Sequence, residues 1–188
     1  MAAPTEKTSK NLSGKWVMNN DLSDSPEPVL QLQGIGYLIR KAVVLASITL
    51  ELKQYDAQPT PPSTETGHVT HIDTQQMVPG LKPTQEKRCL DNEFRDNNDW
   101  LFGIVKTRAR WVRLEDIDDE FLKKDWLVEG DGKTLILSSA ESQGNSWTAT
   151  QVWGFQIVNG ERRYCARVLV INGKKRATAR FVYDYVLL

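Results

Sequence analysis

The pattern of apolar and polar positions changes once along the chain, from a helical period to a strand period. Between residues 29 and 44 apolar residues recur at close to helical spacing, after helix-start signals at residues 24–27. Gly34 and Gly36 weaken this stripe, so we expect one N-terminal helical segment that is open to division into two helices. From residue 47 onward apolar and polar residues alternate, which is typical of half-buried strands.

Strands are therefore expected over most of the remaining chain. The expected strands are residues 12–18, 47–55, 68–78, 84–91, 100–113, 127–129, 134–142, 147–158, 161–171 and 176–187. Residues 56–67 are rich in Pro, Thr and Ser and predict an exposed loop. Residues 114–124 are acidic first and basic last, which predicts a short second helix matched to its own dipole.

Two Asn-Gly pairs join the last three expected strands. Asn159-Gly160 and Asn172-Gly173 each stand between alternating runs, and type I′ hairpin turns favour Asn-Gly because both central positions need positive φ. Successive strands joined in this way form either a sandwich or a barrel, and only the barrel removes the exposed sheet edges. We predict an all-β, up-and-down antiparallel barrel of about eight to ten strands.

The whole chain is interpreted as one domain. Residues 1–10 are small, polar and charged and are expected to be a disordered tail, with a single barrel domain over residues 11–188. Lys and Arg number 24, as do Asp and Glu, and this balance argues against a nucleic-acid binder. No apolar run is long enough to span a membrane. The oligomeric state is left open, with a homodimer as one option.

Motifs of cofactor-dependent and hydrolytic enzymes are absent from the sequence. It has no phosphate-binding glycine loop, no nucleophile elbow and no zinc-binding His motif, so neither a metal nor a cofactor is expected. His68 and His71 are interpreted as ordinary residues at a strand edge, with a general acid or base as the alternative. The first ten residues lack the features of a secretory signal, so we expect a cytoplasmic protein with Cys89 and Cys165 reduced.

Three groups of charged residues each allow two interpretations. The acidic cluster at 116–120 is either a solvated helix start or a cation site. Lys106 and Arg108 lie on one face of an expected strand, which is either exposed to solvent or turned inward to pair with an acidic or phenolic ligand. Glu86 and Arg88, two residues apart, form either an exposed pair or a buried internal ion pair, which is costly and would point to function.

Aromatic side chains give the main indication of a binding cavity. The chain has six tryptophans, and two of the expected strands carry aromatic residues along one face. Such faces form either a packed core or the wall of a ligand cavity with a few polar groups. Trp16 is expected to close one end of the barrel. The residues expected to line the interior and bind substrate are Gln75, Arg88, Trp100, Phe102, Gln151, Trp153, Phe155 and Tyr183.

Short motifs from residue 12 to residue 185 resemble those of a family of small fungal lipocalin-like proteins. The motifs are Leu12-Ser13-Gly14-Lys15-Trp16, Leu32-Gln33-Gly34, Val69-Thr70-His71-Ile72-Asp73, Glu86-Lys87-Arg88, Leu101-Phe102-Gly103, Arg110-Trp111-Val112, Trp147-Thr148-Ala149, Gln151-Val152-Trp153-Gly154-Phe155, Asn159-Gly160-Glu161-Arg162-Arg163-Tyr164 and Val182-Tyr183-Asp184-Tyr185. The resemblance implies a lipocalin-like (calycin-type) barrel. Some members of that family are hetero-Diels–Alderases, which join a tropolone ortho-quinone methide to a humulene-type sesquiterpene in meroterpenoid biosynthesis.

Two functions are therefore expected for a small hydrophobic or aromatic molecule inside the barrel. The first is a cofactor-independent pericyclase, in which the alignment of two apolar partners alone contributes about 7–11 kcal/mol in favourable cases. A hydrogen-bond donor would polarise the heterodiene, and dehydration to form the quinone methide would need one acid and one base. The alternative is a non-catalytic carrier of a small hydrophobic metabolite. No catalytic residue is assigned from the sequence.

Overall fold

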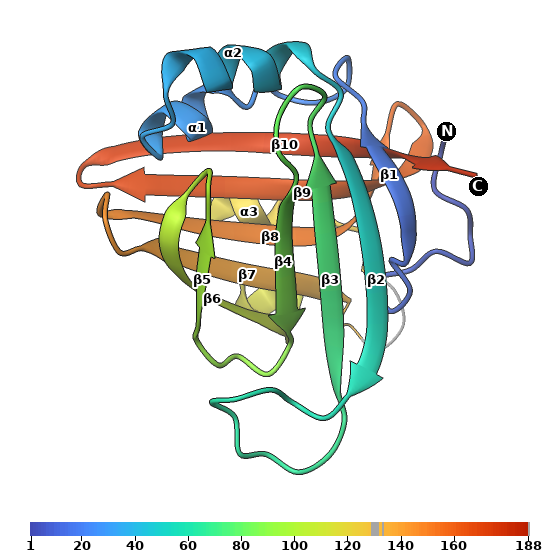
Figure 1. The fold of residues 1–188 in the computed structure, drawn as a ribbon. Helices are drawn as coiled ribbons and strands as arrows, with labels where there is room; N and C mark the ends of the chain where they lie inside the picture. The colour runs from blue at the N-terminus through green and yellow to red at the C-terminus, as the bar shows by residue number, and fades with distance from the viewer. Residues whose placement is uncertain (129–131, 133, 188) are drawn as a thin grey trace.

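Ten antiparallel strands form one continuous sheet that curls into a barrel (Figure 1). The structure is a computed structural model that describes residues 1–128, 132 and 134–187, and all counts below refer to these residues. The strands are β1 (Gly14–Met18), β2 (Thr49–Ala57), β3 (Val69–Met77), β4 (Thr84–Cys89), β5 (Arg95–Asp99), β6 (Gly103–Val112), β7 (Leu135–Ser142), β8 (Trp147–Val158), β9 (Glu161–Asn172) and β10 (Lys175–Val186).

The strand order confirms the predicted up-and-down barrel. It runs β4-β3-β2-β1-β10-β9-β8-β7-β6-β5, so within the described chain each strand pairs with its neighbours in the chain except that β4 does not pair with β5, and β1 also pairs with β10. β4 and β5 are the two edges of the sheet, and no ladder joins them among the described residues. In Figure 1 the strands β2 to β4 cross in front of β7 to β10, so the sheet folds over into two layers.

Both predicted hairpins are present, but the second turn lies one residue further along. Asn159 and Gly160 both have positive φ between the paired Val158 and Glu161, as a type I′ turn requires. In the second hairpin Asn172 itself pairs with Lys175, so the turn residues are 173 and 174. Glycine at the first central position is the pattern of a type II′ turn.

Two short helices close one end of the barrel between β1 and β2. α1 (Glu27–Leu32) and α2 (Tyr37–Leu45) form the expected N-terminal helical segment, divided at residues 33–36. Gly34 has a φ of +81°, which a residue with a side chain rarely adopts, and this conformation ends α1. Figure 1 shows the pair lying across one end of the barrel, and Val29, Leu30 and Val43 turn inward and are buried.

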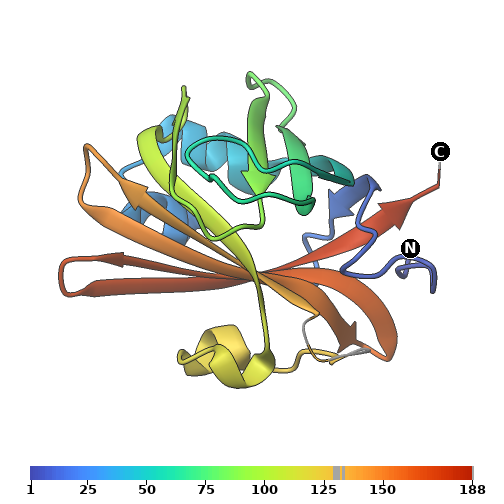
Figure 2. The same ribbon diagram turned by 90° about the horizontal axis from the view of Figure 1, so that it is seen from below.

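The second predicted helix lies on the outside of the barrel and is shorter than expected. It consists of the 3-10 helix η1 (Leu114–Asp116) and α3 (Glu120–Lys123), on the opposite side of the β7–β10 layer from α1 and α2 (Figure 2). Asp119, from the acidic cluster, accepts hydrogen bonds from the backbone N–H groups of Phe121 and Leu122 and pairs with Arg176. The acidic cluster is therefore a helix start. Trp126 packs over Gly154, where a Cβ would come within 2.6 Å of Leu135.

One end of the interior is filled by aromatic rings, as expected for Trp16. Trp16 is fully buried, and its ring centroid lies 6.3 Å from that of Phe155, 5.1 Å from Tyr164 and 4.9 Å from Tyr185. Its indole N–H donates to the carbonyl of Leu12 at 2.9 Å. We call this group of four rings the closed end of the barrel.

The N-terminal segment 1–10 differs from the expected disordered tail. It lies against the closed end, where the N–H of Ala3 donates to the carbonyl of Arg162 at 2.8 Å and the N–H of Tyr185 donates to the carbonyl of Met1 at 3.1 Å. Ala3 is buried. The segment is held by these backbone hydrogen bonds, by an ion pair of the N-terminus with Asp184 and by hydrogen bonds from Arg162 to the carbonyls of Pro4 and Lys7.

The polar strand β5 and the bounds of two expected strands differ from the expectation. β5 was not predicted, because its sequence Arg-Asp-Asn-Asn-Asp has no apolar residue and so no alternation. The expected strand at 100–113 begins only at Gly103. Leu127 and Val128 are not in a strand, and residue 129 lies outside the described residues. Both cysteines are free, as expected, and both are buried.

Candidate functional site

An internal cavity of about 210 Å³ lies between the closed end and the helix pair. Its mouth is formed by α1, by the β3–β4 turn with Leu81 and Lys82, and by the β5–β6 turn with Trp100 and Phe102. Figure 1 shows the helix pair and both turns at the same end of the barrel. Trp100 is 38% exposed, and its indole N–H donates to the carbonyl of Lys82 at 3.1 Å. This bond joins the two turns beside the unpaired edges β4 and β5.

Small residues on neighbouring strands leave the space for the cavity. Ala140 of β7 lies directly opposite Ala149 of β8, and Ala166 of β9 lies opposite Trp153. All four side chains line the cavity. A well-packed interior fills such positions with larger side chains, so this row of alanines keeps the middle of the barrel open.

A buried ion pair stands in the cavity wall. Arg88 and Glu86 point inward from β4, and one Nη of Arg88 pairs with a carboxylate oxygen of Glu86. Their side chains are only 10% and 24% exposed. The guanidinium lies 4.5 Å from the ring centroid of Trp153 and donates weakly to Thr74 at 3.4 Å. The Nε of Arg88 is buried without a partner among the described residues. Of the two interpretations of Glu86 and Arg88, the buried internal ion pair is the one that the structure shows.

The ion pair is electrostatically constrained by its burial. Loss of solvation raises the pKa of Glu86, an effect that the positive charge of Arg88 opposes and that Asp99 reinforces. Loss of solvation likewise lowers the pKa of Arg88, against the influence of Glu86. Each group therefore depends on the other for its charged form.

Two tyrosine hydroxyls belong to the polar part of the wall. Tyr164 of β9 lies directly opposite Tyr183 of β10, with ring centroids 5.4 Å apart, and both line the cavity. Burial raises the pKa of Tyr164, as does the neighbouring Tyr183, and burial also raises the pKa of Tyr183. Both hydroxyls therefore stay protonated at neutral pH. Neither has a hydrogen-bond partner within the described parts of the chain, so both are free to donate to a guest.

Six of the eight residues expected in the site line the cavity. The other two are Gln75 and Phe155. The inward positions of β3 are even-numbered, because Thr74 and Gln76 line the cavity, so Gln75 points outward and the expectation was wrong by one residue. Phe155 faces inward but belongs to the closed end, against Trp16. The six are Arg88, Trp100, Phe102, Gln151, Trp153 and Tyr183.

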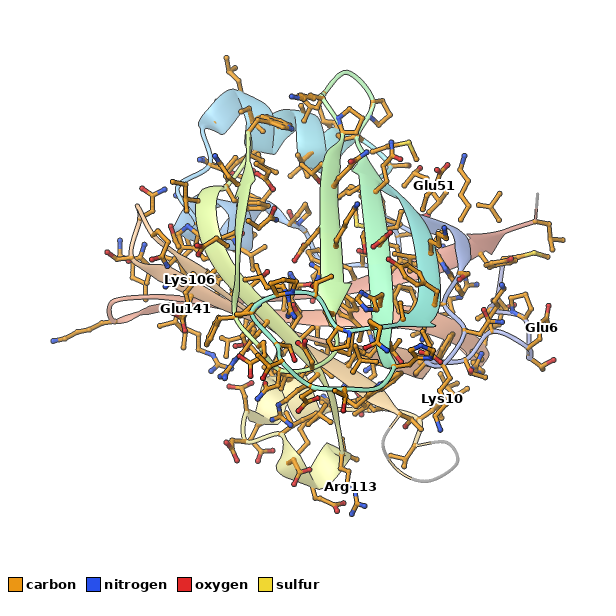
Figure 3. All side chains as sticks on the ribbon, turned by 60° about the horizontal axis from the view of Figure 1, so that its bottom comes forward. Glu6, Lys10, Glu51, Lys106, Arg113 and Glu141 are labelled. Carbon is orange, nitrogen blue, oxygen red and sulfur yellow. The ribbon has the colours of Figure 1, made fainter. Side chains whose placement is uncertain are left out.

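The basic residues of β6 point away from the cavity. Val105 and Thr107 line it, so Lys106 and Arg108 lie on the outer face, and the inward alternative is wrong for both. Figure 3 shows Lys106 beside Glu141 of β7, its cross-strand partner. His71 lies outside the cavity too, with its ring stacked on Tyr55 at 5.2 Å.

Sequence reasoning missed Tyr164 and Trp147 as members of the wall. The position of Tyr164 could have been predicted, because the turn at Asn159-Gly160 fixes the pairing of β8 with β9 and so places Tyr164 opposite Phe155. Glu86 lines the cavity as well, which agrees with its interpretation as part of an internal ion pair. Trp147 is 2% exposed and packs edge-on against Phe102 at 5.9 Å. The alternation along β8 places Trp147 on the aromatic face of that strand, but Trp147 is not among the residues predicted for the site.

No group of three or more His, Cys, Asp and Glu side chains among the described residues is placed to hold a metal ion. No helix in the described parts is long and apolar enough to cross a membrane.

The fold and cavity define a calycin-type barrel, and solved structures agree. The chain superposes on the fluorescent protein UnaG with a TM-score of 0.51 and 16% identity, covering 93% of this chain and 96% of that one. Fatty-acid-binding protein 1 of Echinococcus granulosus gives a TM-score of 0.51 and 10% identity, covering 93% and 97%. At such identities the likeness concerns the fold alone. No family model matches the chain.

Sequence relatives identify the family. The chain is 31% identical over 188 residues to the probable pericyclase scpY of Mollisia scopiformis, covering 98% of this chain and 95% of the relative. It is 29% identical to the pericyclase pydY of an Acremonium species, covering 99% and 97%. The chain therefore belongs to the family of fungal lipocalin-like pericyclases, which are enzymes of the cyclase type.

Proposed function

We propose that the protein is a pericyclase that aligns apolar, oxygen-bearing π systems inside its cavity and joins them in a ring. The observation that carries the proposal is a cluster of hydrogen-bond donors, Arg88, Tyr164 and Tyr183, in a cavity wall that also contains flat aromatic rings. Pericyclic ring closure needs no nucleophile, because bonds form and break in one cyclic redistribution of electrons. Alignment of the reacting carbons between flat rings supplies most of the help that such a reaction needs.

The polar cluster gives the second part of the mechanism. When the reacting π system carries an oxygen, a hydrogen bond to that oxygen draws electron density from the diene or dienophile and lowers the barrier. The hydroxyls of Tyr164 and Tyr183 are protonated donors without hydrogen-bond partners among the described residues, and Arg88 lies in the same wall. Fixed donors of this kind in a site shielded from water contribute about 10²-fold or more each to the rate.

The decisive experiment removes the donors and keeps the rings. Tyr164→Phe and Tyr183→Phe are each expected to lower kcat about 10²-fold, with product stereochemistry unchanged because the cavity keeps its shape. Tyr37→Phe, at an exposed position of α2, is the matched control and is expected to keep full activity. Full activity in both cavity variants would contradict the assigned role of the hydroxyls.

A finer form of the proposal concerns the substrates. The family resemblance supports a hetero-Diels–Alder reaction between a tropolone ortho-quinone methide and a humulene-type sesquiterpene, with assistance to the dehydration that forms the quinone methide. Purified protein with the tropolone precursor and humulenol is expected to give one stereoisomer. A racemic product at the uncatalysed rate would reject these substrates without rejecting pericyclic catalysis.

A non-catalytic carrier is the second candidate. It is favoured by the similarity of the fold to proteins whose names describe the binding of small molecules, such as a fatty-acid-binding protein. A carrier would quench the fluorescence of Trp153 at a stoichiometry of about one guest per chain and release that guest unchanged. Turnover beyond one equivalent distinguishes the pericyclase from it. Cytoplasmic location and oligomeric state stay predictions.

A further inference from the structure

The charges in the cavity wall balance. Among the described residues that line it, Lys82 and Arg88 are the cations and Glu86 and Asp99 are the carboxylates. Lys82 lies in the exposed β3–β4 turn, whereas Arg88 lies deeper in β4, where its side chain is 10% exposed. The only deeply placed cation therefore already has its counter-charge in Glu86.

An anionic guest would have to compete for this cation. A carboxylate placed on Arg88 must share the guanidinium with Glu86, which is two residues away on the same face of β4. It would also add a negative charge near Asp99, which already interacts unfavourably with Glu86. In a site poor in water, like charges at such distances are strongly destabilising.

An uncharged oxygen meets no such obstacle. A carbonyl or hydroxyl oxygen accepts hydrogen bonds from the Tyr164 and Tyr183 hydroxyls and from the remaining N–H groups of Arg88 without displacing Glu86. The guanidinium stays fixed by Glu86 on one side and by the ring of Trp153, 4.5 Å away. The donors are thus held in place before the guest arrives.

We infer that Glu86 is a specificity-determining residue, which neutralises Arg88 and makes the cavity selective for an uncharged, oxygen-bearing guest over a carboxylate of the same shape. The inference rests on the proposed function, in that it takes the cavity as the substrate site. It separates this barrel from a carrier of fatty acids, although the two share a fold.

The test compares two probes of one shape, cis-parinaric acid and its methyl ester, bound to the full-length chain at pH 8. Binding is measured by energy transfer from the tryptophans to the polyene. Glu86→Gln leaves Arg88 as an unpaired buried cation, so the affinity for the acid relative to the ester is expected to rise about tenfold or more. The change in this ratio between variants cancels the different water solubilities of the two probes.

Two further variants make the comparison specific. Glu51→Gln removes the same charge from the outer side of β2, where the side chain is 50% exposed, and is expected to leave the ratio unchanged (Figure 3). The double variant Glu86→Gln with Arg88→Gln removes both buried charges and is expected to return the ratio to the wild-type value. The double variant also keeps the test informative where the single variant is too unstable to measure.

The outcomes separate the inference from the proposed function. A wild-type chain that binds the acid as tightly as the ester, or a ratio unchanged in Glu86→Gln, overturns the inference and leaves the pericyclase proposal standing. A double variant that keeps the raised ratio overturns it as well, because the unpaired arginine is then not the cause. A wild-type chain that binds neither probe overturns both, since the cavity would then admit no guest of this kind.

Discussion

The two halves of the barrel interior contain similar aromatic residues but differ in whether they are filled. At the closed end large residues face large residues across the strands, as Trp16 faces Tyr185 and Phe155 faces Tyr164. In the cavity half small residues stand among the rings, as Ala166 faces Trp153 and Ala149 faces Ala140. The number of rings in a barrel therefore does not determine whether it is hollow. Small residues placed among the rings leave the space.

Tyr164 stands at the boundary between the two halves. Its ring contacts Trp16 and Phe155 on the closed side and Tyr183 on the cavity side. The packed rings thus hold one of the proposed donors in position, so rigidity at the closed end serves chemistry in the open half. Proposed donors held by packing keep their geometry better than donors on loops.

The largest expected effect comes from emptying the closed end. Trp16→Ala removes a fully buried ring that touches three others and is expected to lower the free energy of unfolding by about 3–5 kcal/mol. Chemical denaturation followed by far-UV circular dichroism measures it. A loss below about 1 kcal/mol would show that the closed end is not where packing stabilises the barrel.

The second effect comes from filling the open half. Ala149→Phe places a ring in the cavity beside Ala140 and is expected to lower kcat/KM about 100-fold, because the guest can no longer reach its aligned pose. The free energy of unfolding should change by less than about 1.5 kcal/mol, since the new ring enters existing space. Thr150→Phe, on the other face of the same strand, controls for the substitution itself. Full activity of Ala149→Phe would place the chemistry outside the cavity.

The sequence predicted the architecture better than the wall of the site. Alternation and the Asn159-Gly160 turn were enough for an antiparallel barrel, since period and turn chemistry are local properties. β5 was not predicted at all, because it is a polar strand whose position is fixed by pairing with β6 rather than by its own residues.

Site residues were harder to predict for a physical reason. Successive residues of a strand point to opposite faces of the sheet, so without the register Gln75 and Gln76 are equally good candidates for the inward position. Only the pairing with neighbouring strands determines which of the two points inward. Phe155 shows a second reason. It faces inward as expected, but whether an inward ring lines a cavity or packs solid depends on residues more than 100 positions away in sequence, such as Trp16.

A third, smaller effect concerns the mouth of the cavity. Trp100→Phe removes the hydrogen bond to the carbonyl of Lys82 that joins two turns across the unpaired β4 and β5. A bond of this kind contributes about 0.5–1.5 kcal/mol, so guest release is expected to become about two- to tenfold faster. Stopped-flow displacement of a bound probe measures this rate. The free energy of unfolding should hardly change, in contrast to Trp16→Ala. An equal loss in both variants would mean that the two halves of the barrel contribute equally to stability.

The smallest expected effect lies on the outer wall, which belongs to neither half. Hydrogen bonding from Arg176 holds the pKa of Asp119 below its usual value, although partial burial opposes this. A lowered pKa stabilises the fold above about pH 4, and this contribution is lost as the pH falls through the lowered value. Asp119→Asn keeps a capping side chain for α3 and loses the charge, so we expect a loss of about 0.5 kcal/mol at pH 7.

Denaturation at several pH values tests this origin. The difference between wild type and Asp119→Asn should disappear in acid, where Asp119 is protonated in both states, and the exposed Asp118→Asn should match wild type throughout. A loss at pH 7 as large as that of Trp16→Ala would mean that the helix on the outer wall, rather than the closed end, carries the stability of the barrel. Stability concentrated in the closed end is what leaves the other half free to stay hollow.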